Sequence, residues 1–247
     1  MYDHEKLLKG KLRMNAVICF SPTNQSLQVA SYFSNILSWK LYNLTSFHAQ
    51  TQFDYTVDFQ YLVVCFPVYS QNIPLNVENI LKKIKAEYFV ILATYGKMGK
   101  GNVIYEAKNL ISGKIIGGAY IPSRHSYKDN GEFLKFSKLN ELINRIDKKE
   151  TNQIIIPKES KNIFANFFPH IRSQLGVKMK KNKNCDECNY CNIICPSNAI
   201  HYGQITKKCL RCLKCYYECP NKGLSIKYSI FLRLYLRKDK QEDLIIY

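Results

Sequence analysis

The chain has 247 residues, 46% of them hydrophobic, and its 36 Lys and Arg outnumber 19 Asp and Glu, which gives a formal net charge of +17. This composition can bury a core, and the basic charge favours acidic partners such as redox proteins, anionic lipid or nucleic acid without choosing among them. No apolar run reaches the roughly eighteen residues of a membrane span. Residues 1–15 lack the apolar run of a signal peptide, so we expect a soluble protein of the reducing cytoplasm.

Residues 1–150 alternate β-rich and amphipathic segments, the pattern of a parallel sheet covered by helices. The crossover lengths favour an α/β, doubly wound, flavodoxin-like domain with five strands in the order 2-1-3-4-5. The predicted strands are 15–20, 40–47, 61–66, 88–94 and 114–121, and the predicted helices are 25–39, 75–85, 101–111 and 132–148.

Three predicted loops lie at the carboxyl ends of these strands, where open α/β sheets bind their ligands. The first is a hydroxyl-rich turn that opens a helix, which suits a phosphate. The second carries an aromatic ring, and the third has glycines that allow close backbone approach. No G-x-G-x-x-G follows the first strand, which disfavours a dinucleotide. The candidate ligand-binding residues are Ser21, Thr23, Asn24, Gln25, Ser26, Pro67, Tyr69, Ser70, Thr94, Tyr95, Gly96, Gly99 and Gly101.

Residues 151–182 are predicted to connect this domain to a second one. The stretch 151–157 either adds a strand or lies across the surface, and 159–174 is aromatic and locally helical, with a break at Pro169. Residues 178–183 are expected to form a basic linker. The aromatic cluster of Phe164, Phe167 and Phe168 is expected to pack the two domains together rather than to form an exposed docking patch.

Residues 183–226 hold eight of the ten cysteines, in two copies of C-x2-C-x2-C-x3-C-P that are 24 residues apart. Three thiolates on a short turn can bind three corners of one 4Fe-4S cube, while the fourth reaches the other cube. Two oxidised clusters would lower the net charge to about +13. The rule assigns Cys185, Cys188, Cys191 and Cys219 to one cluster, and Cys195, Cys209, Cys212 and Cys215 to the other.

Zinc is the main alternative, because Cys185, Cys188, Cys209 and Cys212 approach the spacing of a four-cysteine zinc site. That assignment leaves the other four cysteines of the repeat idle and does not explain the proline that ends each copy. Disulfides would need an oxidising compartment. Cys19 and Cys65, near the ends of predicted strands, are expected to be small buried apolar groups.

Residues 227–247 form a basic tail. Within it, 228–237 mixes apolar and basic residues and predicts an amphipathic helix. We expect this helix to pack against its own domain, with weak peripheral membrane contact as the alternative.

The cysteine stretch resembles a bacterial two-cluster ferredoxin, and the three loops resemble those of the flavodoxin/ferredoxin fusion proteins of anaerobic bacteria. In that family a Ser-x-Thr-Gly-Asn-Thr turn holds the FMN phosphate; this chain has Asn24 where the family has Gly. Asn tolerates positive φ better than most residues. The family often has Pro-x-Asn-Tyr after the fifth strand, whereas Arg124 and His125 stand here, so the substrate end differs. The matching residues are Ser21, Thr23, Ser26, Pro67, Tyr69, Thr94, Tyr95, Gly96, Gly99 and Gly101.

The resemblance implies an electron-transfer flavoprotein with FMN and two 4Fe-4S clusters, which exchanges electrons with an acidic redox protein or reduces a small acceptor such as a quinone or nitro compound. No catalytic residue can be named. An alternative is a ferredoxin carrier whose flavodoxin-like domain lacks FMN and serves for docking, which Asn24 favours. A cluster-containing nucleic-acid sensor has no helix-turn-helix or clustered arginines to support it, so no nucleic-acid partner is expected.

Overall fold

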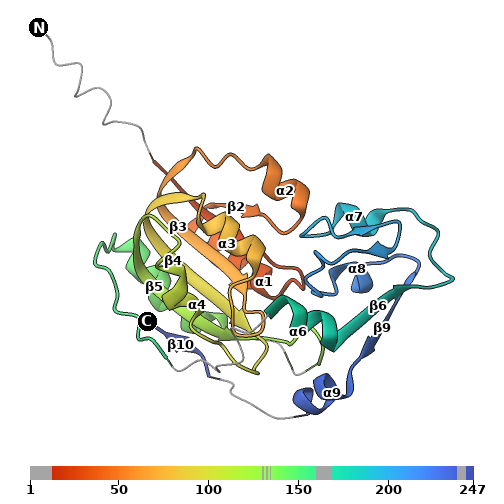
Figure 1. The fold of residues 1–247 in the computed structure, drawn as a ribbon. Helices are drawn as coiled ribbons and strands as arrows, with labels where there is room; N and C mark the ends of the chain where they lie inside the picture. Colours follow the sequence, from red (N-terminus) through yellow and green to blue (C-terminus); the bar gives the residue numbers. More distant parts are fainter. Residues whose placement is uncertain (1–12, 130, 132, 134, 160–168, 238–242) are drawn as a thin grey trace, which may run out of the picture.

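The computed structural model describes residues 13–129, 131, 133, 135–159, 169–237 and 243–247, which form two lobes (Figure 1). We call residues 13–159 with 243–247 the sheet lobe, and residues 169–237 the cysteine lobe. The strands of the sheet lobe are β1 (Met14–Cys19), β2 (Lys40–Asn43), β3 (Asp58–Pro67), β4 (Lys85–Tyr95), β5 (Lys114–Pro122) and β10 (Ile245–Ile246). Its helices are α1 (Gln25–Leu37), α2 (Phe47–Gln52), α3 (Leu75–Leu81), α4 (Val103–Ala107), the short 3-10 helix η2 (Phe136–Leu139) and α5 (Asn140–Asp147).

The sheet lobe is a mixed α/β structure around a six-stranded sheet with the order β10-β5-β4-β3-β1-β2. The predicted order 2-1-3-4-5 is confirmed for the first five strands, which are all parallel. The expectation of five strands was wrong by one, because β10 pairs antiparallel with β5, with Ile245 opposite Tyr120. Part of the predicted tail, the strand β10, therefore forms one edge of the sheet in the sheet lobe.

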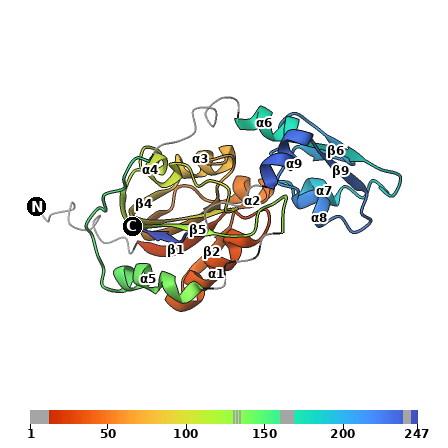
Figure 2. The same cartoon turned by 90° about the horizontal axis from the view of Figure 1, so that it is seen from below.

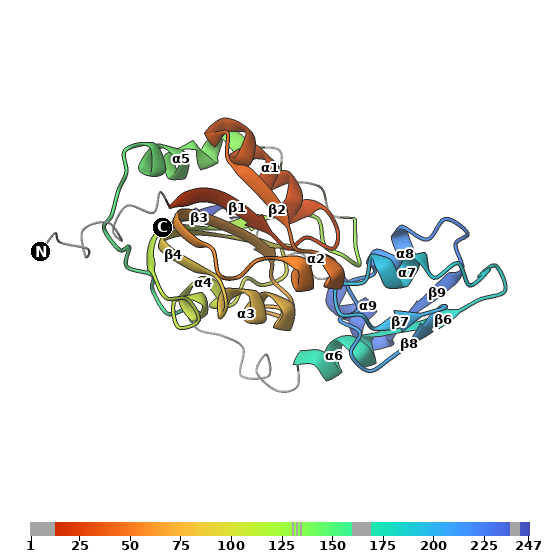
Figure 3. The ribbon, with the colours of Figure 1, turned by 90° about the horizontal axis from the view of Figure 1, so that it is seen from above.

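Each face of the sheet packs against its own helices. Figure 3 shows α1 and α5 above the sheet and α3 and α4 below it. The upper core includes Phe33 and Leu142, and the lower core includes Leu81 and Ile104; all four are fully buried. β3 and β4 lie between other strands and are apolar on both faces along most of their length, as expected for central parallel strands.

The cysteine lobe consists of short elements around a small core of its own. Its strands are β6 (Val177–Lys181), β7 (Ile200–His201), β8 (Gln204–Ile205) and β9 (Leu224–Tyr228), and its helices are α6 (Pro169–Gly176), α7 (Tyr190–Ile193), α8 (Lys214–Tyr217) and α9 (Ile230–Leu236). β6 pairs antiparallel with β9, and β7 with β8. Among the helices of the described part of the chain, none is long and apolar enough to cross a bilayer.

The expected basic linker at 178–183 is instead largely β6. Val177 and Met179 are buried, while Lys178 and Lys180 are exposed, so the segment has the alternation of a half-buried strand. The frequent lysines made it look like a linker, although they occupy only the solvent face. The helix expected at 228–237 is present as α9, with Leu236 buried but Phe231 86% exposed.

Several other boundaries differ from the predictions. The helix expected at 101–111 is limited to Val103–Ala107, and the one expected at 132–148 is a 3-10 turn followed by α5. No strand forms at 151–157; this segment crosses the sheet edge, where the N–H of Ile154 donates to the carbonyl of Ile115 over 2.9 Å. The aromatic cluster at Phe164, Phe167 and Phe168 lies outside the described residues.

The cysteine lobe docks against the carboxyl ends of the parallel strands (Figures 1 and 2). The contacts come from the segments that follow β2, β3 and β5, and they are directed at the loops that carry the cysteines. The N–H of Phe47 donates to the carbonyl of Cys195 (3.0 Å), the Asn76 amide to the carbonyl of Pro196 (2.8 Å), and the Tyr127 hydroxyl to the carbonyl of Arg211 (2.7 Å). The docked edge is the one where open α/β sheets bind ligands.

Candidate metal centres and the loops beside them

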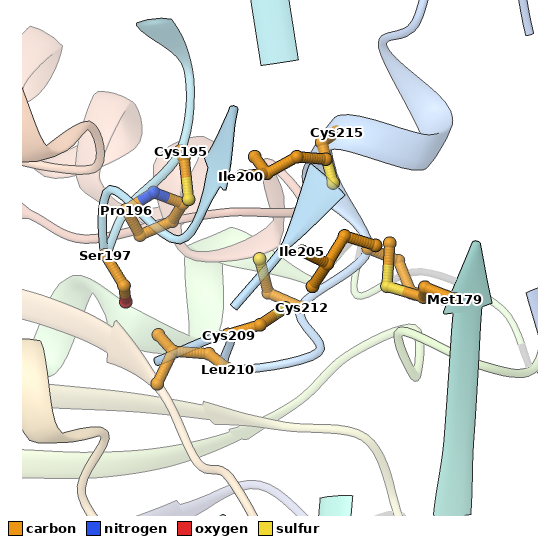
Figure 4. A pocket seen from close by; sticks show the side chains of 11 residues that line it. Met179, Cys195, Pro196, Ser197, Ile200, Ile205, Cys209, Leu210, Cys212 and Cys215 are labelled. Atoms are coloured by element: carbon orange, nitrogen blue, oxygen red, sulfur yellow. The ribbon is translucent and has the colours of Figure 1, made fainter. Parts of the chain in front are cut away.

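The cysteines of the repeat line two separate pockets. We call the first the inner pocket, because it lies beside the sheet lobe; it is lined by Cys195, Cys209, Cys212 and Cys215 together with apolar side chains that include Met179, Ile200 and Ile205 (Figure 4). The outer pocket is lined by Cys185, Cys188, Cys191 and Cys219. Each pocket thus takes three cysteines from one copy of the repeat and the fourth from the other copy, which is the grouping that the ligation rule assigns.

The backbone repeats along with the cysteines. Glu187 and Asn189 flank the second cysteine of the first copy and have φ of 61° and 59°; Arg211 and Leu213 flank the corresponding cysteine of the second copy, with φ of 58° and 64°. Alternation of right- and left-handed residues turns successive N–H groups toward one concave side, a geometry that many iron-sulfur and phosphate sites use. These non-glycine residues tolerate a strained conformation at both pockets.

Backbone N–H groups donate to the fourth cysteine of each copy. The N–H of Ala199 lies 3.2 Å from the Sγ of Cys195, and the N–H of Gly223 lies 3.2 Å from the Sγ of Cys219. A thiolate accepts such bonds better than a thiol does, because it carries a full negative charge. Both pockets therefore offer donors to sulfur that has lost its proton to a metal.

The cysteines of the inner pocket are more deeply buried than those of the outer pocket. Cys195, Cys212 and Cys215 are each 8% exposed, whereas Cys188 is an exposed residue. Burial raises the pKa of the Cys212 thiol to about 12 and also raises the pKa of Cys215. Such thiols do not ionise alone at neutral pH, and a coordinating metal ion removes their protons.

The predicted zinc set is divided between the two pockets. Cys185 and Cys188 line the outer one, and Cys209 and Cys212 line the inner one. Among the described residues, no group of three or more His, Cys, Asp or Glu side chains is close enough to hold a single metal ion. Each pocket instead has four cysteines around one cavity, an arrangement that suits a cluster with volume of its own. Cys19 and Cys65 are fully buried in the sheet lobe.

The turn after β1 has a left-handed residue at Asn24, and most of its hydroxyls form hydrogen bonds within the protein. Asn24 has φ 63°, a left-handed conformation that Asn tolerates better than most residues. The Oγ of Ser21 accepts from the N–H of Leu27 (2.9 Å), and the hydroxyls of Ser26 and Thr94 share a hydrogen bond of 2.7 Å. Of the predicted side-chain contacts to a phosphate, the half-buried Thr23 is the one whose hydroxyl has no bond to another described residue.

The loop after β3 is a tight turn. The N–H of Tyr69 donates to the carbonyl of Asn72 (3.0 Å), and the N–H of Asn72 donates to the carbonyl of Tyr69 (2.9 Å). Ser70 and Gln71 both have positive φ, as in a type I′ turn. Gly101, with φ 62°, lies so close that a Cβ there would be 2.1 Å from the carbonyl oxygen of Gln71. Gly99 also packs on Gln71, so the predicted loops after β3 and β4 do meet.

Two of the predicted ligand-binding aromatic residues do not line an open site. Tyr95 is 1% exposed within the lower core, and its hydroxyl donates to the carbonyl of Asp243 (2.6 Å). Tyr95, a predicted ligand-binding residue, therefore has its ring in the core and its hydroxyl bonded to the C-terminal segment. Tyr69 points its hydroxyl into the interface between the lobes, where burial raises its pKa well above the usual value. Gln25 and Pro67 lie at the same edge, and the Oε1 of Gln25 accepts from the N–H of Arg124 (3.3 Å).

The segment after β5 contacts both the loop after β4 and the cysteine lobe, which its sequence did not indicate. The ring of His125 covers Gly96, where a Cβ would be 2.5 Å from it, and partial burial beside Lys128 lowers the pKa of His125 to about 4. Tyr127 inserts between the lobes and packs with Tyr228, with ring centroids 5.7 Å apart. Nothing in the local sequence marked Tyr127 or Arg211, since their importance arises only when the lobes meet.

Comparisons with known proteins give little more. No protein-family model and no curated protein matches the chain. A distant structural similarity exists to a crystal structure described as a "Putative flavoprotein" from Bacteroides uniformis, with 11% sequence identity and a TM-score of 0.38, over 53% of this chain and 98% of that chain. Similarity at this level identifies neither a ligand nor an activity.

Proposed function

We propose that this chain is an iron-sulfur electron-transfer protein that holds two 4Fe-4S clusters, one in each cysteine pocket. The observation that carries the proposal is the division of the eight cysteines into two sets of four, each drawn from both copies of the repeat. Left-handed residues beside the cysteines and N–H donors to sulfur support the same conclusion. Bound clusters would supply storage of single electrons, which no side chain here provides.

The two pockets are suited to different tasks. The outer pocket has the exposed Cys188, and Tyr190 beside it is 39% exposed, so a partner protein can approach its sulfurs. Three of the four cysteines of the inner pocket are buried, and the sheet lobe docks on the loops that carry them. Outside the pockets, the excess of basic residues favours an acidic redox partner through long-range attraction. We therefore assign electron exchange with a partner to the outer pocket.

The sheet lobe is, in this proposal, a flavodoxin-like domain, and FMN is its second candidate cofactor. The strand order and the left-handed Asn24 in the turn after β1 favour FMN. The bonds among Ser21, Ser26 and Thr94, together with the lobe docked over the carboxyl edge, favour a domain that serves for docking. If FMN binds, Thr23 and the backbone of the turn would hold its phosphate.

Metal and flavin analysis of the chain purified without oxygen tests these statements. We expect about eight iron and eight sulfide ions per chain. Stoichiometric zinc without sulfide would overturn the proposal. About one FMN per chain, released on denaturation, would assign the flavin, and its absence from a fully iron-loaded protein would assign the docking role.

Single substitutions test the crossed grouping. Cys219→Ser should remove the outer cluster, although its first three cysteines lie in the other copy of the repeat, and should leave about half of the iron. Cys195→Ser should remove the inner one. Cys19→Ala, in the core of the sheet lobe, is the control and should keep both. Loss from the Cys209, Cys212 and Cys215 pocket in Cys219→Ser would contradict the grouping.

A further inference from the structure

Three side-chain atoms of the described residues are buried without any hydrogen-bond partner. They are the hydroxyl oxygen of Tyr69 and two guanidinium nitrogens, Nε and Nη1, of Arg211. A buried donor without an acceptor lowers the stability of a protein, because it has lost its bonds to water. Their persistence in one place indicates that something else accepts from them.

All three atoms belong to residues near Cys212, which lines the inner pocket. Arg211 stands between two of its cysteines, Cys209 and Cys212, and its charge acts on the buried Tyr127. Tyr69 comes from the sheet lobe, and the ionisable groups that act on its hydroxyl are Cys212 and the same Tyr127. Each lobe thus contributes an unpartnered donor from a residue near Cys212.

The sheet lobe holds Tyr69 there at some conformational cost. Ser70 and Gln71 follow it with φ of 51° and 65°, and neither is glycine. Strained backbone of this kind persists only where the surroundings hold it, and here Gly99 and Gly101 pack directly on Gln71. The turn therefore presents the Tyr69 hydroxyl in a fixed position.

Nearby protein acceptors are already in use. The carbonyl of Arg211 accepts from Tyr127, and the Sγ of Cys209 accepts from the N–H of Arg211 (3.4 Å). A four-thiolate cluster in the inner pocket carries net negative charge in both redox states, and more in the reduced state. A buried cation and a buried phenol act strongly on such a charge.

We infer that Tyr69 and Arg211 are positioning residues for the inner cluster: they compensate its negative charge, so the sheet lobe takes part in setting the reduction potential of a cluster in the other lobe. This inference rests on the proposed function. Because both residues stabilise the more negative, reduced state, they raise the potential. Docking of the lobes and the redox behaviour of the inner cluster are then coupled.

The outer pocket provides an internal comparison. Its nearby cation, Lys181, is already paired with Glu187, and among the described residues no unpartnered buried donor lies there. Tyr202, which is 55% exposed, lies in the turn near Asn189 of that pocket, to whose side chain its N–H donates. Tyr202→Phe removes a hydroxyl of the same kind from a wet site and serves as the control.

The test is a redox titration of the fully iron-loaded protein, followed by electron paramagnetic resonance, for Tyr69→Phe, Arg211→Gln and Arg211→Lys. We expect Tyr69→Phe and Arg211→Gln each to make reduction of the inner cluster about tenfold less favourable, a shift of about 59 mV for one electron. The outer cluster should not change. Arg211→Lys keeps the charge and should restore most of the potential.

The outcomes separate this inference from the proposed function. Full iron content with unchanged potentials, or equal shifts in both clusters, would overturn the inference and leave the two clusters in place. A shift in Arg211→Lys as large as that in Arg211→Gln would also overturn it, because packing and not charge would then be the cause. Absence of clusters from the unmodified protein would overturn the proposed function itself.

Discussion

Gly223→Ala should damage the outer pocket selectively. A Cβ on Gly223 would lie 2.8 Å from the Cα of Cys185 and 2.9 Å from its Cβ, closer than real Cβ contacts. Both contacts involve atoms fixed by the backbone, so Cys185 must move. Overpacking of this kind costs about 1–3 kcal/mol, which corresponds to a loss of about 5- to 150-fold in the occupancy of the intact site.

Ala199 is the natural control, because it holds the matching position in the other copy of the repeat. It is 0% exposed and already carries a Cβ, and its N–H donates to Cys195 as that of Gly223 does to Cys219. Ala199→Gly removes a methyl group without creating an overlap and should cost about 0.5–1 kcal/mol. Both clusters should survive in that variant.

The assay is iron content and the rate of iron transfer to a chelator, measured without oxygen on both variants and on the unmodified protein. In Gly223→Ala we expect about half of the iron to leave faster, with the spectrum of the inner cluster retained. If Gly223→Ala loses no iron, or loses it equally from both clusters, then overlap with Cys185 does not damage the outer cluster selectively, and the prediction is refuted.

Three further predictions concern the sheet lobe. Thr23→Ala should weaken FMN binding by about one to two orders of magnitude, because a bond to a charged group contributes about 1.5–3 kcal/mol; riboflavin titrations should show no change, and equal losses for both ligands would point to misfolding of the turn. The pKa of His125 is lowered to about 4 from 6.5, chiefly by burial and then by Lys128, so its contribution to stability is complete above pH 6.5, declines as pH falls from 6.5 to 4 and is lost below 4. Denaturation between pH 7 and 5 should show this loss, at most about 2 kcal/mol after allowance for partial exposure, and His125→Gln should reduce the slope; an unchanged slope would refute the assignment. Asn76→Ala removes the amide that donates to the carbonyl of Pro196 over 2.8 Å and should weaken docking by about 1–2 kcal/mol, seen as faster hydrogen exchange at the inner pocket with slow exchange preserved in the central strands.

Much of the architecture followed from local patterns in the sequence. The apolar runs of β3 and β4 and the amphipathic α1 predicted a parallel sheet and its order, because burial on both faces or on one face leaves a direct mark on residue type. The repeat spacing predicted two sets of four cysteines, since a short turn fixes which thiolates can reach one site. Asn24 was expected to tolerate positive φ, and it does, because that preference is local to one residue.

What the sequence missed depends on contacts between distant segments. β10 has two residues and no pattern of its own; it becomes a strand only because β5 offers a free edge. Tyr95 was expected in a ligand-binding loop, but its ring lies in the core and its hydroxyl donates to the C-terminal segment. The spacing of the cysteines likewise says nothing about which pocket is more deeply buried.

The relation between the lobes was the part that only the tertiary structure decided. The loops of the repeat and the carboxyl edge of the sheet each follow from their own local sequence. Neither residue pattern predicts that the two will be in contact. Docking joins them through hydrogen bonds to the carbonyls of Cys195, Pro196 and Arg211. The hydroxyl of Tyr69 is likewise buried without a hydrogen-bond partner. Burial of a polar atom depends on all the segments that pack around it, so no single stretch of sequence predicts it.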